Sequence, residues 1–296
     1  MLDKIKYYIQ KLRRPGYLAI DKKRREVPVE PWAFIRVKNE IATLDACLKS
    51  ILPVIKKGVI GYHKLNPDEK DDGTEEYIKN FCRENPGFIL YKHDYEVIPA
   101  CDERYKNLED ISDENTLAGY YNAVLSQIPK GEWLIKIDCD HIYDSEKLRQ
   151  LMYLPKMDND VISISRFNLH YGNDKLYVLK NRAVINPRDH WLIKNDDFKF
   201  FMACGYENEN FYAWEQTNLK EKIRKNRINM YDTNLINWHF PNVKASRHDY
   251  KEPMIQFDQF KLSYFKRKFI YYVDNDMLDE ERILEICRKF KIKNIK

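Results

Sequence analysis

Short apolar runs alternate with amphipathic segments through the first half of the chain. The runs are rich in β-branched and aromatic residues, which is typical of buried strands, and the segments between them repeat apolar residues every three or four positions, which is typical of helices. The predicted strands cover residues 32–37, 58–63, 88–91 and 133–137, and the predicted helices cover residues 43–52, 75–84 and 116–128. This alternation predicts a single Rossmann-like α/β domain, with a mostly parallel central sheet and helices on both faces.

The pattern is less regular in the second half of the chain. It predicts a short helix at residues 145–152, a strand at 160–167, its returning partner at 175–179 and a helix at 217–225. The polar segment 93–115 is expected to be a functional or mobile loop because of its length. The expected organisation is a basic N-terminal segment at residues 1–28, a central domain at 29–240 and a helical, basic C-terminal appendage at 241–296.

Three carboxylates, Asp138, Asp140 and Asp144, follow the predicted strand at residues 133–137. A strand that ends in Asp-x-Asp puts oxygen ligands where an open α/β sheet has its ligand crevice. Such oxygens can hold Mg²⁺ or Mn²⁺ against the diphosphate of a nucleotide. The chain has no Gly-x-Gly-x-x-Gly loop, so the diphosphate would be held through a metal rather than at a glycine-rich helix start. The alternative is a solvated acidic turn.

Two residues further along the chain are candidates for chemistry. Glu215 follows Trp214 and opens the predicted helix, where a carboxylate can accept a proton from a sugar hydroxyl; helix capping is the alternative interpretation. His239 stands between aromatic residues and can supply a neutral nitrogen to a metal. His141 and His190 are alternatives to it, and so is an ordinary packed histidine.

Polar residues also follow the first two predicted strands. They are Arg36, Asn39, Glu40 and Asp72. Because the carboxyl ends of neighbouring parallel strands share one edge of the sheet, a nucleotide base and ribose would be bound there. Asp72 begins an Asp-Gly-Thr sequence that also fits a plain turn before a helix. Lys136, inside the fourth strand, is expected to pair with an aspartate or to extend to the surface.

The net charge of +5 conceals basic ends around an acidic middle. Residues 1–25 contain nine Lys or Arg and two Asp, and residues 259–296 contain ten Lys or Arg and six Asp or Glu. An acidic body argues against a nucleic-acid enzyme, whose groove would be basic. The basic ends fit peripheral contact with an anionic membrane surface or a partner subunit in a homo-oligomer, and ordinary packing on the domain explains them equally well.

Targeting signals are absent from the sequence. No run approaches about 18 apolar residues, and no apolar region precedes a small-residue cleavage site. The six cysteines form no Cys-x-x-Cys pair, so reduced thiols are expected. These features predict a cytoplasmic protein that can associate peripherally with the inner face of the cytoplasmic membrane.

In their order and spacing, four motifs resemble those of GT-A glycosyltransferases. They are residues 36–40 after the first strand, Asp72-Gly73-Thr74, the run 131–140 that ends in Asp-x-Asp, and Trp214-Glu215. The resemblance covers about residues 32–240. More narrowly, residues 34–40, 50–52 and 138–143 are similar to those of bacterial lipooligosaccharide β-1,4-N-acetylgalactosaminyltransferases.

This resemblance implies an inverting, metal-dependent transfer of N-acetylgalactosamine from a UDP-sugar to a lipooligosaccharide or ganglioside-like glycan. It implies that Asp140 binds Mn²⁺ or Mg²⁺, that His239 completes the coordination, and that Asp138 lies near the metal or the ribose. Glu215 would be the general base that deprotonates the acceptor hydroxyl. The implied donor-binding residues are Arg36, Asn39, Glu40, Asp72, Lys136 and Asp138.

Several alternatives stay open within this resemblance. The usual catalytic Glu-Asp pair is Glu215-Gln216 in this chain, so Glu207, Glu209 and Asp189 are alternative bases. A sialylated acceptor would need cationic side chains near the site. The available ones are Arg166, Arg182, Arg188, Lys244 and Arg247. The rival functions are a nucleotidyltransferase acting on a sugar phosphate, which also uses paired aspartates, and a glycan-binding module without catalysis.

Overall fold

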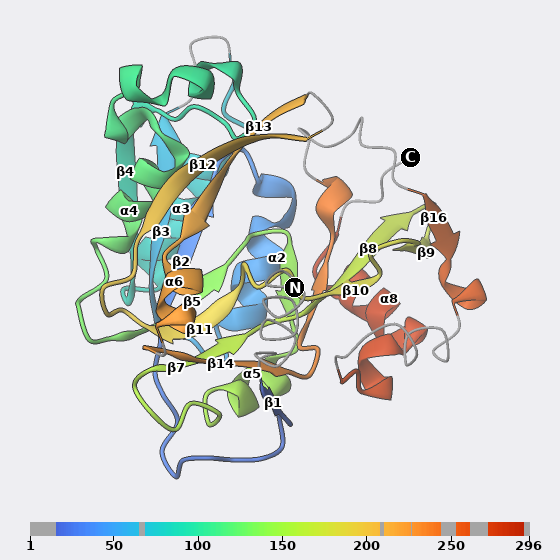
Figure 1. Cartoon of the computed structure of the whole chain (residues 1–296). Coiled ribbons are helices and arrows are strands. Elements are labelled where there is room, and N and C mark those ends of the chain that lie inside the picture. The colour runs from blue at the N-terminus through green and yellow to red at the C-terminus, as the bar shows by residue number, and fades with distance from the viewer. Residues whose placement is uncertain are drawn as a thin grey trace, which may run out of the picture.

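A mixed eight-stranded sheet forms the centre of the molecule (Figure 1). The computed structural model describes residues 16–64, 69–207, 210–225, 227–243, 253–260 and 272–292. In sheet order the strands are β1 (Gly16–Leu18), β14 (Asn229–Thr233), β7 (Asp160–Ser163), β11 (Trp191–Lys194), β5 (Trp133–Ile137), β2 (Trp32–Val37), β3 (Lys57–Lys64) and β4 (Phe88–Glu96). Neighbouring strands are parallel except at β11, which runs antiparallel to both β5 and β7.

The four strands predicted in the first half of the chain are all present and parallel to one another. Strands β2 and β5 have the predicted bounds, whereas β4 continues to Glu96 and takes in the start of the expected loop. The rest of that polar segment contains two 3-10 helices, η1 (Glu103–Asp110) and η2 (Asp113–Asn115). Tyr105 fixes them: its buried hydroxyl donates to the carbonyl of Ile98 and accepts from the N–H of Leu117.

Helices cover both faces of the main sheet. On one face lie α2 (Ile41–Ile51), α3 (Thr74–Glu84) and α5 (Ser145–Leu151), and on the other lie α4 (Leu117–Leu125) and α6 (Leu219–Arg224). Side chains of β5 alternate between the two layers, as a pleated strand requires. Ile135 packs in the same core cluster as Leu48 of α2, whereas Leu134 packs with Val124 of α4.

Side-chain caps fix where two of these helices begin. The hydroxyl of Thr116 accepts from the N–H of Gly119 at the start of α4, and the carboxylate of Asp144 accepts from the N–H of Lys147 at the start of α5. A cap of this kind contributes about 1 kcal/mol. The third carboxylate of the acidic run is therefore a helix cap, and only Asp138 and Asp140 remain as candidate ligands at the end of β5.

A smaller sheet stands beside the main one. Its strands, in order, are β16 (Met254–Gln256), β9 (Lys175–Leu179), β8 (Arg166–Gly172), β15 (Asn237–His239) and β6 (His141–Tyr143), and β10 (Val184–Ile185) also pairs with β8. The predicted strand 160–167 is therefore two strands: β7 belongs to the main sheet and β8 to the smaller one. Strand β9 returns antiparallel to β8, but it pairs with residues 169–172, which lie beyond the predicted strand at 160–167.

A long hairpin, β12 (Phe200–Glu207) and β13 (Asn210–Thr217), crosses in front of the main sheet in Figure 1. The structure corrects the prediction that Glu215 opens a helix, because Glu215 lies within β13 and α6 begins only at Leu219. The physical reason is the aromatic content of β13, which favours a paired strand; Trp214 lies directly opposite Ala203 of β12.

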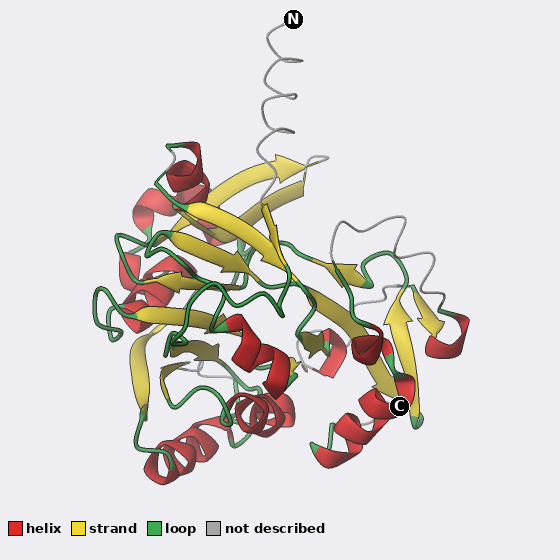
Figure 2. Cartoon of the chain, turned by 90° about the horizontal axis from the view of Figure 1, so that it is seen from below, coloured by secondary structure: helices red, strands yellow, loops and turns green. Residues whose placement is uncertain are grey.

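The described residues after 240 pack against the smaller sheet. They form η3 (Pro241–Val243), β16, η5 (Phe257–Gln259), η6 (Asn275–Leu278) and α8 (Glu280–Lys289). Trp238 donates its indole N–H to the carbonyl of Met277 at 2.9 Å, and Ile283 and Cys287 of α8 are fully buried in the same core cluster. The small sheet and α8 lie on the right of the molecule in both Figure 1 and Figure 2.

The membrane or subunit contact predicted for the terminal basic segments falls largely on residues 1–15 and 261–271, which lie outside the described residues. Among the helices that are described, none is both long and apolar enough to cross a membrane. All six cysteines fall within the described ranges, and none of them forms a disulfide there.

Candidate functional site

The two aspartates at the end of β5 face different neighbours. Asp138 follows the last residue of β5, and Asp140 directly precedes β6 of the smaller sheet. The short connection between the two strands therefore places one carboxylate beside the main sheet and the other beside the smaller sheet. Two separate polar groups result, one around each aspartate.

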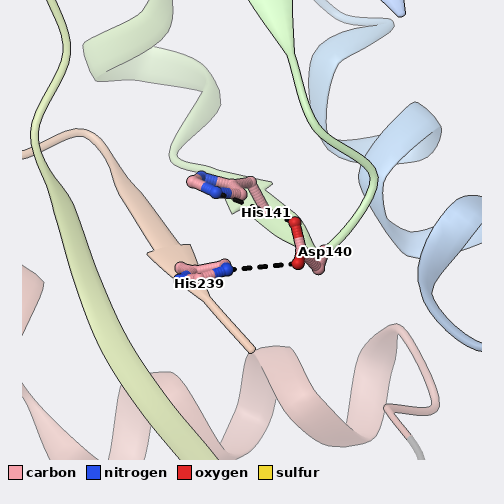
Figure 3. Close-up of side chains that lie close together, drawn as sticks. All are labelled: Asp140, His141 and His239. Carbon is pink, nitrogen blue, oxygen red and sulfur yellow. Dashed lines mark hydrogen bonds and ion pairs between the residues drawn. The ribbon is translucent and has the colours of Figure 1, made fainter. Parts of the chain in front are cut away.

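Asp140 stands opposite two histidines (Figure 3). Strands β6 and β15 are antiparallel, and their register puts His141 directly across from His239. Oδ2 of Asp140 lies 3.1 Å from Nε2 of His239, and Oδ1 lies 3.8 Å from Nε2 of His141. All three side chains are buried, and one ligand atom from each lies within 4.8 Å of the others.

Two asparagines fix the tautomers of these histidines. Nδ1 of His141 lies 2.9 Å from Oδ1 of Asn237, whose amide nitrogen donates to the carbonyl of Ser165. Nδ1 of His239 lies 2.6 Å from Oδ1 of Asn168, whose amide nitrogen donates to a backbone carbonyl at residue 182. Because both asparagines present an oxygen, each histidine donates from Nδ1 when it is neutral and keeps its Nε2 lone pair.

The resulting donor set fits a divalent transition metal. Nε2 of His141 is buried and has no hydrogen-bond partner among the described residues. Burial lowers the pKa of His141 well below its ordinary value of 6.5, and the neighbouring His239 and His190 lower it further, so the imidazole is neutral as a metal ligand must be. Two imidazole nitrogens beside one carboxylate, each oriented by a second hydrogen bond, are typical of a metal centre.

Asp138 lies in a second, cation-rich group. Its Oδ1 accepts from the guanidinium of Arg36, and its Oδ2 lies 3.0 Å from Nε2 of His190 and 3.6 Å from the ammonium of Lys136. Burial opposes the charge of Asp138, but Lys136, His190 and Arg36 together hold its pKa well below its ordinary value. The carboxylate is therefore ionised and already neutralised by protein cations, and it is not part of the group around Asp140.

His190 connects two carboxylates. Its Nδ1 lies 2.8 Å from Asp189 and its Nε2 lies 3.0 Å from Asp138. Burial lowers the pKa of His190, but the two carboxylates outweigh that effect and raise it above 6.5. The rings of His190, His141 and His239 stack in that order, with centroids 4.5 and 4.4 Å apart, so His190 links the Asp138 group to the Asp140 group.

Arg36 brings the candidate base into the same region. Its guanidinium lies over the ring of Tyr121, 3.9 Å from the centroid. Burial lowers the pKa of Arg36, but Tyr121 and the carboxylates of Asp138 and Glu215 raise it by more, so the guanidinium stays charged. Glu215 on β13 therefore lies near the Asp138 group, and it lines the same pocket as Lys136, even though it is more than 70 residues from Asp138 in the sequence.

A pocket of about 570 Å³ opens beside these residues. Its charged lining consists of Lys136, Arg188, Asp189, Glu215 and Lys220. The rest of the lining is largely apolar and includes the aromatic side chains of Trp191, Phe200 and Trp214. An apolar pocket with a few convergent polar groups is the usual form of a small-molecule site.

The residues predicted to read the nucleotide lie at the ends of β2 and β3, where they tie two helices together. Asp72 accepts from the backbone and hydroxyl of Thr74 and from the N–H of Ile41, which is the turn-and-cap arrangement. The amide nitrogen of Asn39 donates to the carbonyl of Lys70, and the N–H of Glu40 donates to Thr74. Oδ1 of Asn39 is buried and has no partner among the described residues.

Most of the residues named as alternative bases or as cationic acceptor contacts lie in the described part of the chain. Glu207 ends β12 at the far end of the hairpin from Glu215, and Glu209 lies outside the described residues. Arg166 pairs with Asp189 at 3.1 Å, and Arg188 lies 3.6 Å from Asp232. Residues 244–252, which include two of the predicted cationic side chains, Lys244 and Arg247, are not described.

Sequence reasoning missed the two asparagines. Asn237 precedes His239 by two residues on β15, and that spacing on a strand puts both side chains on one face, which is a usable signal. Asn168 lies on β8, and its contact with His239 depends on the parallel pairing of β8 with β15. No local pattern in the sequence predicts that pairing.

A family model described as Beta-1,4-N-acetylgalactosaminyltransferase (CgtA) matches residues 2–291, nearly the whole chain. None of the curated proteins matches the chain.

Proposed function

The chain belongs to the CgtA family of beta-1,4-N-acetylgalactosaminyltransferases and is therefore a glycosyltransferase, and we propose that it transfers N-acetylgalactosamine from its UDP derivative to a glycan hydroxyl, with inversion. The observation that carries this proposal is the buried group of Asp140, His141 and His239 at the end of β5. A parallel sheet interrupted by the antiparallel β11, with a second sheet next to it, supports a GT-A fold.

Asp140, His141 and His239 would hold the metal. When bound, it would act as a Lewis acid that neutralises the departing UDP diphosphate. Two nitrogen ligands favour Mn²⁺ over Mg²⁺, because Mg²⁺ prefers oxygen ligands and octahedral geometry. Lys136 and Arg36 place positive charge around Asp138, and we assign the ribose and diphosphate side of the donor to this part of the site.

Glu215 is the proposed general base. It lines the pocket and interacts with Arg36, which itself binds Asp138. Asp189 lines the same pocket, but its carboxylate contacts His190 and Arg166; burial raises its pKa, yet His190 and Lys136 hold that pKa well below the ordinary value. A strongly acidic carboxyl is a poor proton acceptor, so the chemistry favours Glu215 over Asp189.

The pocket beside Glu215 is the proposed acceptor site. Arg188 and Lys220 add positive charge to its lining, which supports a glycan that carries an anionic sugar such as sialic acid. The basic terminal segments, residues 1–25 and 259–296, are proposed to bring the enzyme to an anionic membrane surface, where a lipid-linked acceptor would be found.

The test is release of UDP from a panel of UDP-sugars, with Mn²⁺, with Mg²⁺ and with a chelator. The expected result is preference for UDP-N-acetylgalactosamine, loss of activity with the chelator, and better recovery with Mn²⁺ than with Mg²⁺. Activity that is insensitive to the chelator would contradict the metal centre. Release of pyrophosphate from a nucleoside triphosphate would indicate a nucleotidyltransferase instead, and glycan binding without any UDP release would indicate a binding module.

A further inference from the structure

Three large aromatic side chains are exposed on one face of the β12–β13 hairpin. The exposed fractions are 41% for Phe201, 39% for Tyr212 and 39% for Trp214. On the premise of the proposed function, we infer that this face is a stacking platform for an oligosaccharide, which binds the acceptor sugars that follow the one held in the pocket.

The strand register puts these rings on one surface. In an antiparallel hairpin, directly paired residues point to the same face, and so do residues two positions apart along a strand. The pairs on this face are Phe201 with Gln216, Ala203 with Trp214, and Gly205 with Tyr212. The two larger rings of β13 thus lie opposite the smallest side chains of β12, which leaves their surfaces uncovered from that side.

The opposite face of the hairpin packs against the rest of the domain. Its pairs include Phe200 with Thr217 and Met202 with Glu215. Phe200 is buried in the core beneath α4, and Glu215 interacts with Arg36 of the main sheet. One face of the hairpin therefore packs on the domain and carries the proposed base, and the other carries the aromatic rings.

The platform is continuous with the pocket. Trp214, Glu215 and Gln216 all line the pocket, whereas Tyr212 lies one step further along β13, roughly 7 Å beyond Trp214. A chain whose first sugar reaches Glu215 would therefore pass over Trp214 and then over Tyr212. The amide of Gln216, with donors and an acceptor, lies at the pocket edge of the platform, where it can meet sugar hydroxyls.

The size and chemistry of the platform favour a saccharide over a protein. Rings of 150–250 Å² that are about 40% exposed offer roughly 200–300 Å² in total, well below the ~800 Å² that each partner of a stable protein interface buries. One face of a pyranose ring consists of C–H groups that pack on an aromatic ring, while its hydroxyls stay hydrated at the edge. An uncharged aromatic row next to a pocket with a few charged groups in its lining matches that amphipathic character.

The experiment compares ring-removing and ring-keeping variants on defined sugars. The probes are galactose, lactose and the linear trisaccharide galactosyllactose, which all begin with a non-reducing galactose and extend it by no, one and two sugars. Binding is measured by saturation-transfer NMR titration with UDP and Mn²⁺ present. Trp214→Ala should weaken lactose and the trisaccharide at least about fivefold, a loss of about 1 kcal/mol. Tyr212→Ala should weaken only the trisaccharide, by a similar factor. Tyr212→Phe should bind like the wild type because the stacking ring remains.

Tyr206→Ala is the matched control, because Tyr206 is 70% exposed on the opposite face of the same hairpin, where it pairs with Phe211. It should change no affinity, and thermal unfolding should show that every variant is folded. The platform is overturned if the wild type binds none of the three probes, if the Ala variants bind the trisaccharide normally, or if Tyr206→Ala weakens it equally. Because binding is measured without turnover, a failure of UDP-sugar transfer in the wild type is a separate result that affects only the proposed function.

Discussion

Asn168 and Asn237 determine which ring nitrogen carries the proton in each of the two histidines beside Asp140. Each presents its carbonyl oxygen to Nδ1 and uses its amide nitrogen on a backbone carbonyl, so neither amide can turn over without losing a hydrogen bond. Residues that hold metal ligands in this way usually change metal affinity about 10- to 100-fold when they are replaced.

Asn237→Leu should therefore weaken Mn²⁺ binding about 10- to 100-fold, because His141 loses the acceptor that keeps its lone pair at Nε2. Isothermal titration of the metal-free protein with Mn²⁺ checks this. Asn237→Asp, which keeps an acceptor oxygen at the same place, is the control and should retain most of the affinity. Equal affinity in the wild type and in Asn237→Leu would mean that the asparagine has no part in metal binding.

The pH dependence of stability should reveal that His141 is kept neutral. Its pKa lies well below 6.5 in the folded protein, so between that value and 6.5 the unfolded chain binds a proton that the folded protein does not. Stability of the metal-free protein should therefore fall as the pH decreases below about 6.5, by up to ~1.4 kcal/mol per pH unit.

Urea unfolding between pH 7.5 and 5 measures this effect as the difference between wild type and His141→Gln. The wild type should lose more stability on acidification, because the variant lacks the group that takes up the proton. His190, whose raised pKa acts in the opposite direction, is present in both proteins and largely cancels in the comparison. Parallel pH profiles would show that His141 is not kept neutral by the fold.

At the residue scale the sequence predicted two side chains that the structure brings together, but it did not predict all of their neighbours. Asp140 and His239 were expected from a motif and from an aromatic context, and the structure brings them within 3.1 Å. His141 was only an alternative, because nothing in the sequence shows that β6 pairs with β15. Asp138 was expected near a metal or ribose, and its three cationic partners come from separate elements whose meeting depends on the strand order of the sheet.

The β12–β13 hairpin carries both the proposed base and the proposed stacking platform. Glu215 lies on its inner face, and the pocket opens beside it. Because a paired strand is more rigid than a loop, β13 can hold a base at a fixed place next to the acceptor.

Glu215→Gln should lower turnover about 100-fold or more and leave the affinity for UDP unchanged, because the amide cannot accept the proton. Glu207→Gln, at the other end of the same hairpin, is the matched control and should keep wild-type turnover. Steady-state kinetics with UDP-N-acetylgalactosamine and an acceptor glycan check both variants. A large loss in the control together with normal turnover in Glu215→Gln would move the base to Glu207.

Elements with strong local patterns were predictable, and those defined by distant pairing were not. Strands β2 and β5 appear with the predicted bounds because their apolar runs are bordered by turn residues. Strand β11 was missed, since its four residues become a strand only between β5 and β7. The hairpin was also missed, because Gly205 and the polar residues near its tip mask the aromatic alternation of β13.

At the scale of the whole molecule, the main sheet and the smaller sheet are connected at the candidate metal site. Strand β6 connects Asp140 to the smaller sheet, and Trp238 of β15, next to His239, contacts the C-terminal residues through Met277. The described residues after 240 therefore support the strand that supplies a proposed metal ligand.

Ile283→Ala in α8 should lower the free energy of unfolding by about 2–5 kcal/mol, because it removes a fully buried side chain. Calorimetry should show one cooperative transition, shifted to lower temperature for the whole protein. Glu285→Ala, on the exposed side of α8, is the control and should change little. A separate early transition, with the main one unshifted, would instead indicate that residues 241–296 are an independent appendage.

The most direct test of the central claim is pulsed electron paramagnetic resonance of Mn²⁺ bound to the protein with UDP. Modulation of the electron spin echo reports nitrogen nuclei in the coordination shell. The account predicts two imidazole nitrogens in the wild type and one in His239→Gln, whose altered side chain no longer offers an imidazole. Bound Mn²⁺ with no imidazole nitrogen in the wild type would contradict the assignment of Asp140, His141 and His239 as the metal centre.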